Sequence, residues 1–445
     1  AISRFITFEL GKTDGQRLNK VYSTAVLIQL VIAAVVVSVA EPVGLWFISK
    51  EMTIDPSRIP AARTVLHFSL ASFVISMMSV PQMASITAHE KMSAYAYIGL
   101  LDGFLRLGAA VLISRSSSDR LVLYAALMTM TVLLVRMAYG LYCRRYFPEC
   151  RFRMVRDLSL VREMFSFAGW NFIGVTSGVL RDHGGNILVN LFSGPVVNAA
   201  RGVAVQLNGA VQSFVTNFMT AVNPQITKYY AVGDLTHMHK LIYYGTRFSY
   251  YLFMFISIPV IFEIESILTV WLGEVPVHTV LFTRLVLVLS LIDIFSQILI
   301  TAQNATGNIR NYQLVVGGLY LLNLPFSYLL LKMGMIPEMT LVVAIVIAIV
   351  CMIARLCFLR YSIKLRVFDY VLKVVLNGLL VTAISLVAPW LCYHHIVAPL
   401  WQFFAVCGAS VVSSAVSIYY IGCSSSERNM INSYVVKFYH KLLRR

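Results

Sequence analysis

Charged residues are scarce in this chain, and acidic residues are the scarcest. Only 13% of the 445 residues are charged, with 20 acidic against 36 basic, while 58% are hydrophobic and the mean hydropathy is +0.76. About a quarter of the residues in soluble domains are charged, so the composition excludes an ordinary soluble protein. Continuous apolar runs of about 20 residues can cross a bilayer as helices, and the lack of strict alternation excludes a β-barrel. The sequence predicts an all-α polytopic membrane protein.

Catalytic, nucleotide-binding and metal-binding motifs are also lacking. The sequence holds no Walker A motif, no GxSxG, no HExxH and no dinucleotide fingerprint. Its seven cysteines form no CxxC pair and lie mostly in or beside apolar segments, as small buried hydrophobic residues do. We therefore expect neither an enzyme nor a bound metal or cofactor. Without a P-loop, any transport would be driven by an ion gradient or by the gradient of the substrate.

Twelve segments are long and apolar enough to cross a bilayer. Their predicted limits are 21–48, 64–88, 93–114, 120–142, 163–192, 196–223, 241–262, 279–303, 310–331, 338–360, 370–391 and 399–421. We expect five regions: a first lobe over 1–142, a basic cytoplasmic linker over 143–162, a second lobe over 163–360, two additional helices over 361–421, and a basic cytoplasmic tail over 422–445.

Basic residues gather on one side of the predicted topology. When the connectors are assigned alternately to two sides, beginning with 1–20, one side holds 24 lysines and arginines, among them Arg355 near the end of the tenth span, and the other holds six. Because cytoplasmic connectors are enriched in lysine and arginine, the richer side is cytoplasmic. This placement accounts for the net charge of +16 and argues against nucleic-acid binding.

The two halves of the sequence repeat short patterns. The stretch SITAH at 85–89 ends the second span, and LITAQ at 299–303 ends the eighth; four residues between 6 and 20 recur between 226 and 240 at an offset of 220. Both matches fall at corresponding places relative to the spans, which indicates two lobes related by a parallel repeat around a central cavity. Aligning the lobes leaves the first one short at its start, so we expect two further helices before residue 1 and about fourteen in all.

Six arginines lie inside predicted spans. An arginine at the centre of a membrane helix costs about 2.5–3.5 kcal/mol, so six isolated ones would cost roughly 15–20 kcal/mol, more than the stability of an ordinary domain. They must pair, extend to the membrane surface or face a wet interior, and a wet cationic interior holds anions. The six are Arg106, Arg136, Arg181, Arg201, Arg247 and Arg284, of which the last two are expected to reach the membrane surfaces.

The fifth span carries candidate binding residues on one face. Asn171 and Arg181 recur there with Gly174, Gly178 and a further glycine at steps of three or four, and Asp182 follows directly. We predict that Arg181 contacts the anionic group of a substrate and that Asn171 and Asp182 shape the cavity. The alternative is a small-residue packing seam in which Arg181 pairs with a neighbouring carboxylate.

The sixth span carries a polar stripe that begins with Arg201, Asn208 and Gln212. A stripe this regular cannot face lipid. We predict that Arg201 contacts the anionic group while Asn208 and Gln212 shape the cavity. Hydrogen bonding between helices is the alternative.

Further candidates lie in the third, fourth and eighth spans. Asp102 and Arg106 are four residues apart and can pair on one helical face; together with Arg136 they would face the cavity from the first lobe, unless the pair is purely structural. Asp293 in the eighth span is a candidate for proton or sodium coupling, because burial can make a carboxylate titratable. A structural role for Asp293 is equally open.

Five stretches carry a family resemblance. They are RFITFELGK at 4–12, AHEKM at 88–92, FAGWN at 167–171, GPVVNAARG at 194–202 and NPQIT at 223–227. They resemble the Wzx-type oligosaccharide flippases, above all versions from Bacteroides-like bacteria, within the multidrug/oligosaccharidyl-lipid/polysaccharide exporter superfamily. The resemblance covers essentially the whole chain. Members of this family have two six-helix lobes and commonly two further helices, in agreement with the expected fourteen.

The resemblance implies the movement of an undecaprenyl-pyrophosphate-linked sugar repeat unit, for O-antigen (lipopolysaccharide) or capsule, to the outer leaflet of the bacterial cytoplasmic membrane. The implied mechanism is alternating access, and the implied partners are the lipid-linked oligosaccharide, membrane lipids and other polysaccharide-assembly proteins. A pyrophosphate head group suits an arginine-lined interior, because guanidinium binds phosphate through two parallel hydrogen bonds.

Three other functions fit the sequence less well. A cation-coupled multidrug exporter of the same superfamily would favour acidic residues in its cavity, whereas here arginine is in excess. A membrane glycosyl polymerase or ligase would need large outer connectors, and those of this chain are short. A structural scaffold would need no buried arginines.

Overall fold

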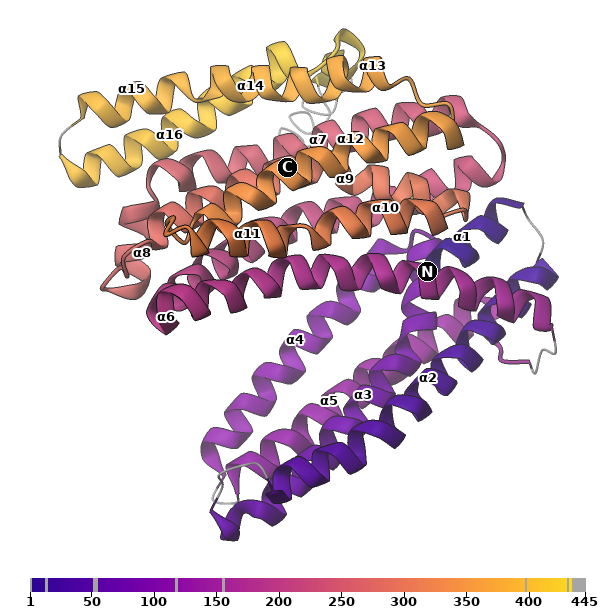
Figure 1. Cartoon of the computed structure of the whole chain (residues 1–445). Coiled ribbons are helices and arrows are strands. Elements are labelled where there is room, and N and C mark those ends of the chain that lie inside the picture. The colour runs from indigo at the N-terminus through magenta and orange to yellow at the C-terminus, as the bar shows by residue number, and fades with distance from the viewer. Residues whose placement is uncertain are drawn as a thin grey trace, which may run out of the picture. The chain divides into compact units, whose positions relative to one another are not determined.

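The computed structural model describes residues 2–12, 15–50, 55–116, 119–153, 157–396, 398–429 and 432–433. Within these residues every regular element is a helix, and eleven helices are long and apolar enough to cross a membrane (Figure 1). The predicted class, an all-α polytopic membrane protein, is confirmed. Residues 154–156 of the predicted linker, and 430–431 and 434–445 of the predicted tail, lie outside the described part.

The chain divides into two compact units, of which unit 1 comprises Ala1–Gly169 and Thr227–Asp234. In unit 1, α3 packs along both α5 and α2, and the apolar side chains of Ile86, Tyr139 and Cys143 form a buried cluster. Its helices are α1 (Ile2–Lys12), α2 (Gly15–Lys50), η1 (Pro56–Arg58), α3 (Ile59–Ala88), α4 (Met92–Arg115), α5 (Arg120–Tyr146), η2 (Pro148–Cys150) and the two ends of α6 (Leu158–Ala231).

Unit 2 comprises Trp170–Ile226 and Leu235–Arg445. Here α9 takes the central place and packs along α12 and α7, while α15 and α16 form an antiparallel pair whose α16 contacts α7 (Figure 1). Besides the middle of α6, its helices are α7 (Leu235–Phe262), α8 (Ile264–Leu272), α9 (Thr279–Thr306), α10 (Arg310–Leu321), α11 (Asn323–Lys332), α12 (Met339–Ser362), α13 (Val367–Tyr370), the π-helical turn η3 (Val371–Leu376), α14 (Asn377–Ser385), α15 (Val387–His395), α16 (Pro399–Ser417) and the π-helical turn η4 (Ile418–Gly422).

The helix α6 is interrupted at Gly194. Gly194 has φ +83° and ψ 176°, a conformation that glycine adopts readily and that breaks the helix; Pro195, next in the chain, has no N–H to donate. A straight helix of 74 residues would be roughly 110 Å long, far more than a bilayer, so α6 crosses twice. Counting its two halves separately gives twelve spans in the described residues, at the places predicted from hydropathy.

The two units repeat the same order of helices. The contacts of α3 with α5 and α2 in unit 1 correspond to those of α9 with α12 and α7 in unit 2. In unit 1, His89 at the end of α3 forms a hydrogen bond with Glu149 just beyond α5. In unit 2, Ser362 Oγ at the end of α12 donates to Gln303 Oε1 near the end of α9, at 3.1 Å. His89 and Gln303 are residues that the sequence repeat matched, and each forms a side-chain hydrogen bond at the C-terminal end of the helix that packs beside its own.

Candidate functional site

Arg181 in α6 is held by two carboxylates. Its Nε donates to Asp182 Oδ1 at 2.9 Å and its Nη2 donates to Asp293 Oδ2 of α9 at 3.2 Å. Arg181 and Asp293 are largely buried, whereas Asp182 is exposed. The Nη1 of Arg181 has no hydrogen-bond partner. The ion-pairing alternative for the fifth span therefore describes the Nε and Nη2 groups of Arg181, while the two N–H donors of Nη1 have no partner.

A second guanidinium, that of Arg355 in α12, lies close by. Its Nε donates to the Tyr312 hydroxyl at 3.1 Å and its Nη2 to the Tyr320 hydroxyl at 2.5 Å. The Tyr320 ring also lies 4.7 Å from the Arg181 guanidinium and 5.4 Å from that of Arg355. Tyr320 therefore contacts two cations, which its π-face and its hydroxyl dipole help to accommodate.

Arg355 was not among the site residues predicted from the sequence. Its place near the end of a span assigned it to the cytoplasmic side, yet the residue is only 1% exposed. The side chain is buried and hydrogen-bonds to Tyr312 and Tyr320 of α10. The signal available in the sequence was that Arg355 lies seven residues before the end of an apolar helix that contains no acidic residue.

Arg201 lies in the second half of α6 and is 5% exposed. Its Nη1 donates to Thr340 Oγ1 and its Nη2 to the Asp182 backbone carbonyl, both at the long distance of 3.4 Å, and its Nε has no partner. In the described part of the chain no carboxylate lies within ion-pair distance of it. A β-carbon at Gly185 would lie 2.6 Å from this guanidinium, so the glycine makes the space that Arg201 occupies.

The charges of this cluster do not balance. The three guanidinium groups of Arg181, Arg201 and Arg355 are met by the carboxylates of Asp182 and Asp293. The cluster therefore carries an excess of one positive charge. A buried cation without a counter-charge is costly, so an anion at Arg201 would be stabilised.

The other predicted residues of α6 lie apart from these three arginines. Asn171 is half-buried and ten residues before Arg181, roughly 15 Å along the helix. Asn208 Oδ1 and Gln212 Oε1 are buried and have no partner. The structure thus leaves acceptors of the sixth-span stripe unpaired but does not bring them into contact with Arg201.

The glycines of the fifth span are used partly for packing. A β-carbon at Gly174 would lie 1.8 Å from Gln313 Oε1 of α10, whereas one at Gly178 would have no atom within 4 Å. Close approach of α6 and α10 at Gly174 is the small-residue seam considered above.

In unit 1, Asp102 and Arg106 form the predicted pair along α4, with Nε to Oδ1 at 3.0 Å, and Arg106 is exposed. Arg136 Nη1 donates to the Ile75 carbonyl of α3 at 3.4 Å, and within the described residues it has no carboxylate partner. The structure places these three residues on two helices of one unit.

The two remaining span arginines are compensated. Arg247 forms an ion pair with Glu427. Arg284 donates to the Ile261 carbonyl at 3.2 Å, lies 3.9 Å from Glu265 and is partly exposed. Of the six arginines predicted inside spans, Arg136 and Arg201 are thus without a carboxylate in the described residues. Nor do these residues contain a group of three or more His, Cys, Asp or Glu side chains that could hold a metal.

Comparison with known proteins identifies the fold. No family model and no curated protein sequence matches the chain. Among solved structures, it is similar to a MOP superfamily transporter from Pyrococcus furiosus, with TM-score 0.69, 10% identity and 83% of each chain covered. It is also similar to an outward-facing multidrug resistance MATE family transporter, with TM-score 0.68, 11% identity and 83% of each chain covered. A third is the MATE transporter ClbM in complex with Rb+, with TM-score 0.66, 14% identity, and 81% of this chain and 82% of that one covered. The chain therefore has the fold of the MATE and MOP superfamily transporters.

Proposed function

We propose that this protein is a membrane transporter for an anionic substrate and that Arg201 is the residue that meets the anion. The observation that carries the proposal is a guanidinium only 5% exposed, with two long hydrogen bonds and no carboxylate partner in the described residues. An anion would supply the missing counter-charge and accept from the free Nε.

The substrate that fits best is a lipid-linked oligosaccharide with a pyrophosphate head group. The resemblance to Wzx-type flippases supports this substrate, and guanidinium forms paired hydrogen bonds with phosphate oxygens. The protein would move the undecaprenyl-linked unit from the inner to the outer leaflet of the bacterial cytoplasmic membrane by alternating access. In this proposal Arg181 joins Arg201 on the head group, Asp182, Asn171, Asn208 and Gln212 shape the cavity, and Asp102, Arg106 and Arg136 contribute from the first lobe.

Coupling to an ion gradient would act through Asp293. Its carboxylate holds Arg181 at 3.2 Å. A proton or sodium ion on Asp293 would weaken this ion pair and free the Arg181 guanidinium for the substrate. Binding of the coupling ion and binding of the anion would then favour each other.

A cation-coupled multidrug exporter is the second candidate. Two structural relatives favour it, since one is a multidrug resistance transporter and one was solved with Rb+. The Pyrococcus furiosus transporter instead has a binding pocket of reverse polarity, which suggests a different function for that protein. The excess of arginine over carboxylate in the cluster around Arg201 supports the anionic substrate for this chain.

The test is leaflet-resolved detection of the lipid-linked glycan in cells that depend on this protein. With Arg201→Ala, we expect the glycan to accumulate in the inner leaflet while the protein stays inserted, and with Arg201→Lys we expect partial export because the charge remains. Arg284→Ala is the matched control, because this arginine also lies in a span but is partly exposed and outside the cluster; export should stay normal. Normal export with Arg201→Ala, or export of organic cations by the wild type, would contradict the proposal.

A further inference from the structure

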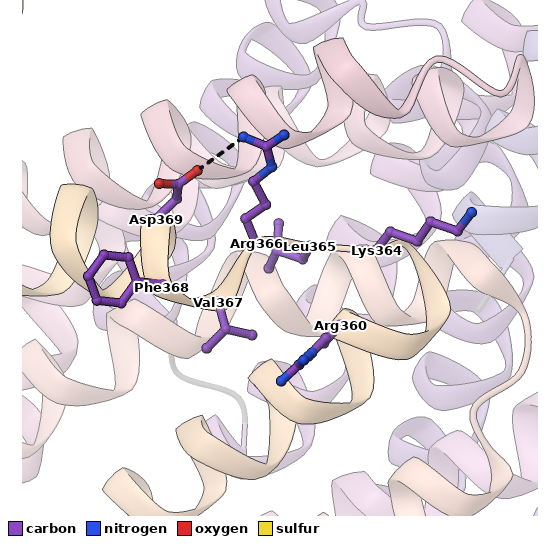
Figure 2. A pocket seen from close by; sticks show the side chains of 7 residues that line it. All are labelled: Arg360, Lys364, Leu365, Arg366, Val367, Phe368 and Asp369. Carbon is purple, nitrogen blue, oxygen red and sulfur yellow. Dashed lines mark ion pairs between the residues drawn. The ribbon is translucent and has the colours of Figure 1, made fainter.

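The segment between α12 and α13 forms a pocket of about 630 Å³ in unit 2. We call Ser362–Arg366 the connecting strap. Figure 2 shows the seven side chains that line the pocket, with the ion pair of Arg366 and Asp369 as a dashed line. They are Arg360, Lys364, Leu365, Arg366, Val367, Phe368 and Asp369. The lining combines cations with apolar groups.

The strap is held in place by its own buried residues. Ile363 is 0% exposed and Leu365 is 2% exposed, so these two side chains anchor the strap in the protein. Lys364 and Arg366 alternate with them and are exposed. Lys364 has φ +54°, a left-handed conformation that is uncommon outside glycine and that the surrounding structure must maintain.

Two side chains of α7 fix the backbone of the strap. His239 Nε2 lies 3.0 Å from the Ile363 carbonyl, and the Tyr243 hydroxyl donates to the Arg366 carbonyl at 3.3 Å. The backbone that carries Lys364 and Arg366 is therefore held by hydrogen bonds to α7, which lowers the backbone entropy lost when they bind a ligand.

The charge of the pocket is positive. It is lined by three cations and one carboxylate. Asp369 lies 3.9 Å from Arg366 and is shared with Lys373 at 3.6 Å. In the described part of the chain, Arg360 and Lys364 take part in no ion pair. The lining residues thus carry an excess of two positive charges.

Two exposed aromatic residues belong to or adjoin the lining in sequence. Phe368, which lines the pocket, is 78% exposed, and Tyr361, next in the chain to Arg360, is 85% exposed. Tyrosine is enriched at the level of the lipid head groups, and the excess of basic residues predicts that this end of α12 lies on the cytoplasmic side. We therefore expect the pocket to open at the level of the lipid phosphates.

From this geometry we infer a binding site for a lipid whose head group carries two phosphate groups. Two phosphates with one negative charge each match the excess of two positive charges, and the apolar side chains of Val367 and Phe368 accommodate the beginning of the lipid chains. Both a diphosphate-linked polyprenol and a membrane lipid with two phosphodiesters have this chemistry. The site does not depend on the proposed transport activity, because it concerns binding alone.

Binding is measured with the full chain in phosphatidylcholine nanodiscs, by titration with four probes: sugar-linked undecaprenyl diphosphate, whose two phosphates carry one negative charge each, cardiolipin, phosphatidylglycerol and inorganic pyrophosphate. We expect at least one two-phosphate lipid to bind about tenfold more tightly than phosphatidylglycerol or inorganic pyrophosphate. Preference for undecaprenyl diphosphate that persists in Arg201→Ala and is lost in Lys364→Gln would identify the polyprenol as the ligand of this pocket, and preference for cardiolipin would identify the membrane lipid. Equal binding of phosphatidylglycerol, or of free pyrophosphate, would overturn the site.

Charge variants complete the test. Lys364→Gln and Arg366→Gln should each weaken binding of the preferred lipid about fivefold or more, whereas Asp369→Asn should strengthen it, an effect that a folding defect cannot produce. Lys332→Gln removes the same charge at the end of α11, outside the pocket, and should change nothing. Unchanged binding in Lys364→Gln and Arg366→Gln would refute the inference.

Discussion

Gly185 and Arg201 lie on opposite sides of the break in α6, and the Arg201 guanidinium fills the space next to the Gly185 α-carbon. A β-carbon there would be 2.6 Å from two of the guanidinium nitrogens. The position of the cation thus depends on a missing side chain sixteen residues earlier in the same helix.

Gly185→Val should therefore displace Arg201 and reduce export at least tenfold while leaving the arginine in the chain. The measurement is the leaflet-resolved glycan assay together with the amount of inserted protein. Gly178→Ala is the control on the same helix, because a β-carbon there meets no atom within 4 Å; it should retain export and stabilise the helix by about 0.5–1 kcal/mol. Full export by Gly185→Val would argue against a role for the position of Arg201.

Asp293→Asn should lower the free energy of unfolding by about 1–3 kcal/mol, because it leaves the buried Arg181 with one carboxylate instead of two. Combining it with Arg181→Gln should restore part of the loss, with a coupling of about 0.5–3 kcal/mol in a double-mutant cycle. Asp182→Asn is the matched comparison: this partner is exposed, so its loss should cost less. Strictly additive effects of Asp293→Asn and Arg181→Gln would show that the ion pair is not formed.

Tyr320→Phe removes a hydroxyl that accepts from Arg355 and leaves one more donor of this buried guanidinium unsatisfied. We expect a loss of about 1–3 kcal/mol in stability, measured by thermal unfolding in detergent. Tyr328→Phe is the control on α11, because this tyrosine is exposed. Equal melting temperatures for the two variants would contradict the hydrogen-bonded placement of Arg355.

Glu149 provides a test of pH dependence in unit 1. Burial alone would raise the pKa of Glu149. The hydrogen bond from His89 and the backbone hydrogen bond together lower the pKa by more than burial raises it, so the pKa lies below its ordinary value of 4.5. The carboxylate therefore stabilises the fold above pH 4.5, and this contribution is lost as the pH falls through the lowered pKa. Between pH 6 and pH 3, the melting temperature should fall less steeply with decreasing pH in Glu149→Gln than in the wild type. Parallel pH profiles would refute this role.

Hydropathy was sufficient to predict the spans, because the bilayer imposes a minimum length of apolar helix on every crossing. It also separated the two halves of α6, since Gly194 and Pro195 mark the break in the sequence. Hydropathy carries no information on which side chains meet in space. The pair of Arg181 with Asp293, 112 residues apart, could only be predicted as two separate candidates. For the same reason Arg355 was not expected to be buried against the tyrosines of α10.

The break at Gly194 also sets the depth of the cations. Backbone groups released there cannot be left facing lipid, and the break separates two halves that are each long enough to cross a bilayer, so we expect it near the membrane surface. Arg201 and Arg181 then lie about 10 Å and 20 Å away along the two halves of the helix, well inside a hydrocarbon layer about 30 Å thick. An anion bound at that depth would already have crossed part of the electric field. In the cytoplasmic membrane proposed above, whose inner side is negative, the voltage would favour outward movement by about 2.3 kcal/mol per charge at 100 mV. The proposed head group with two charges would gain about twice as much, a contribution that adds to any coupling through Asp293.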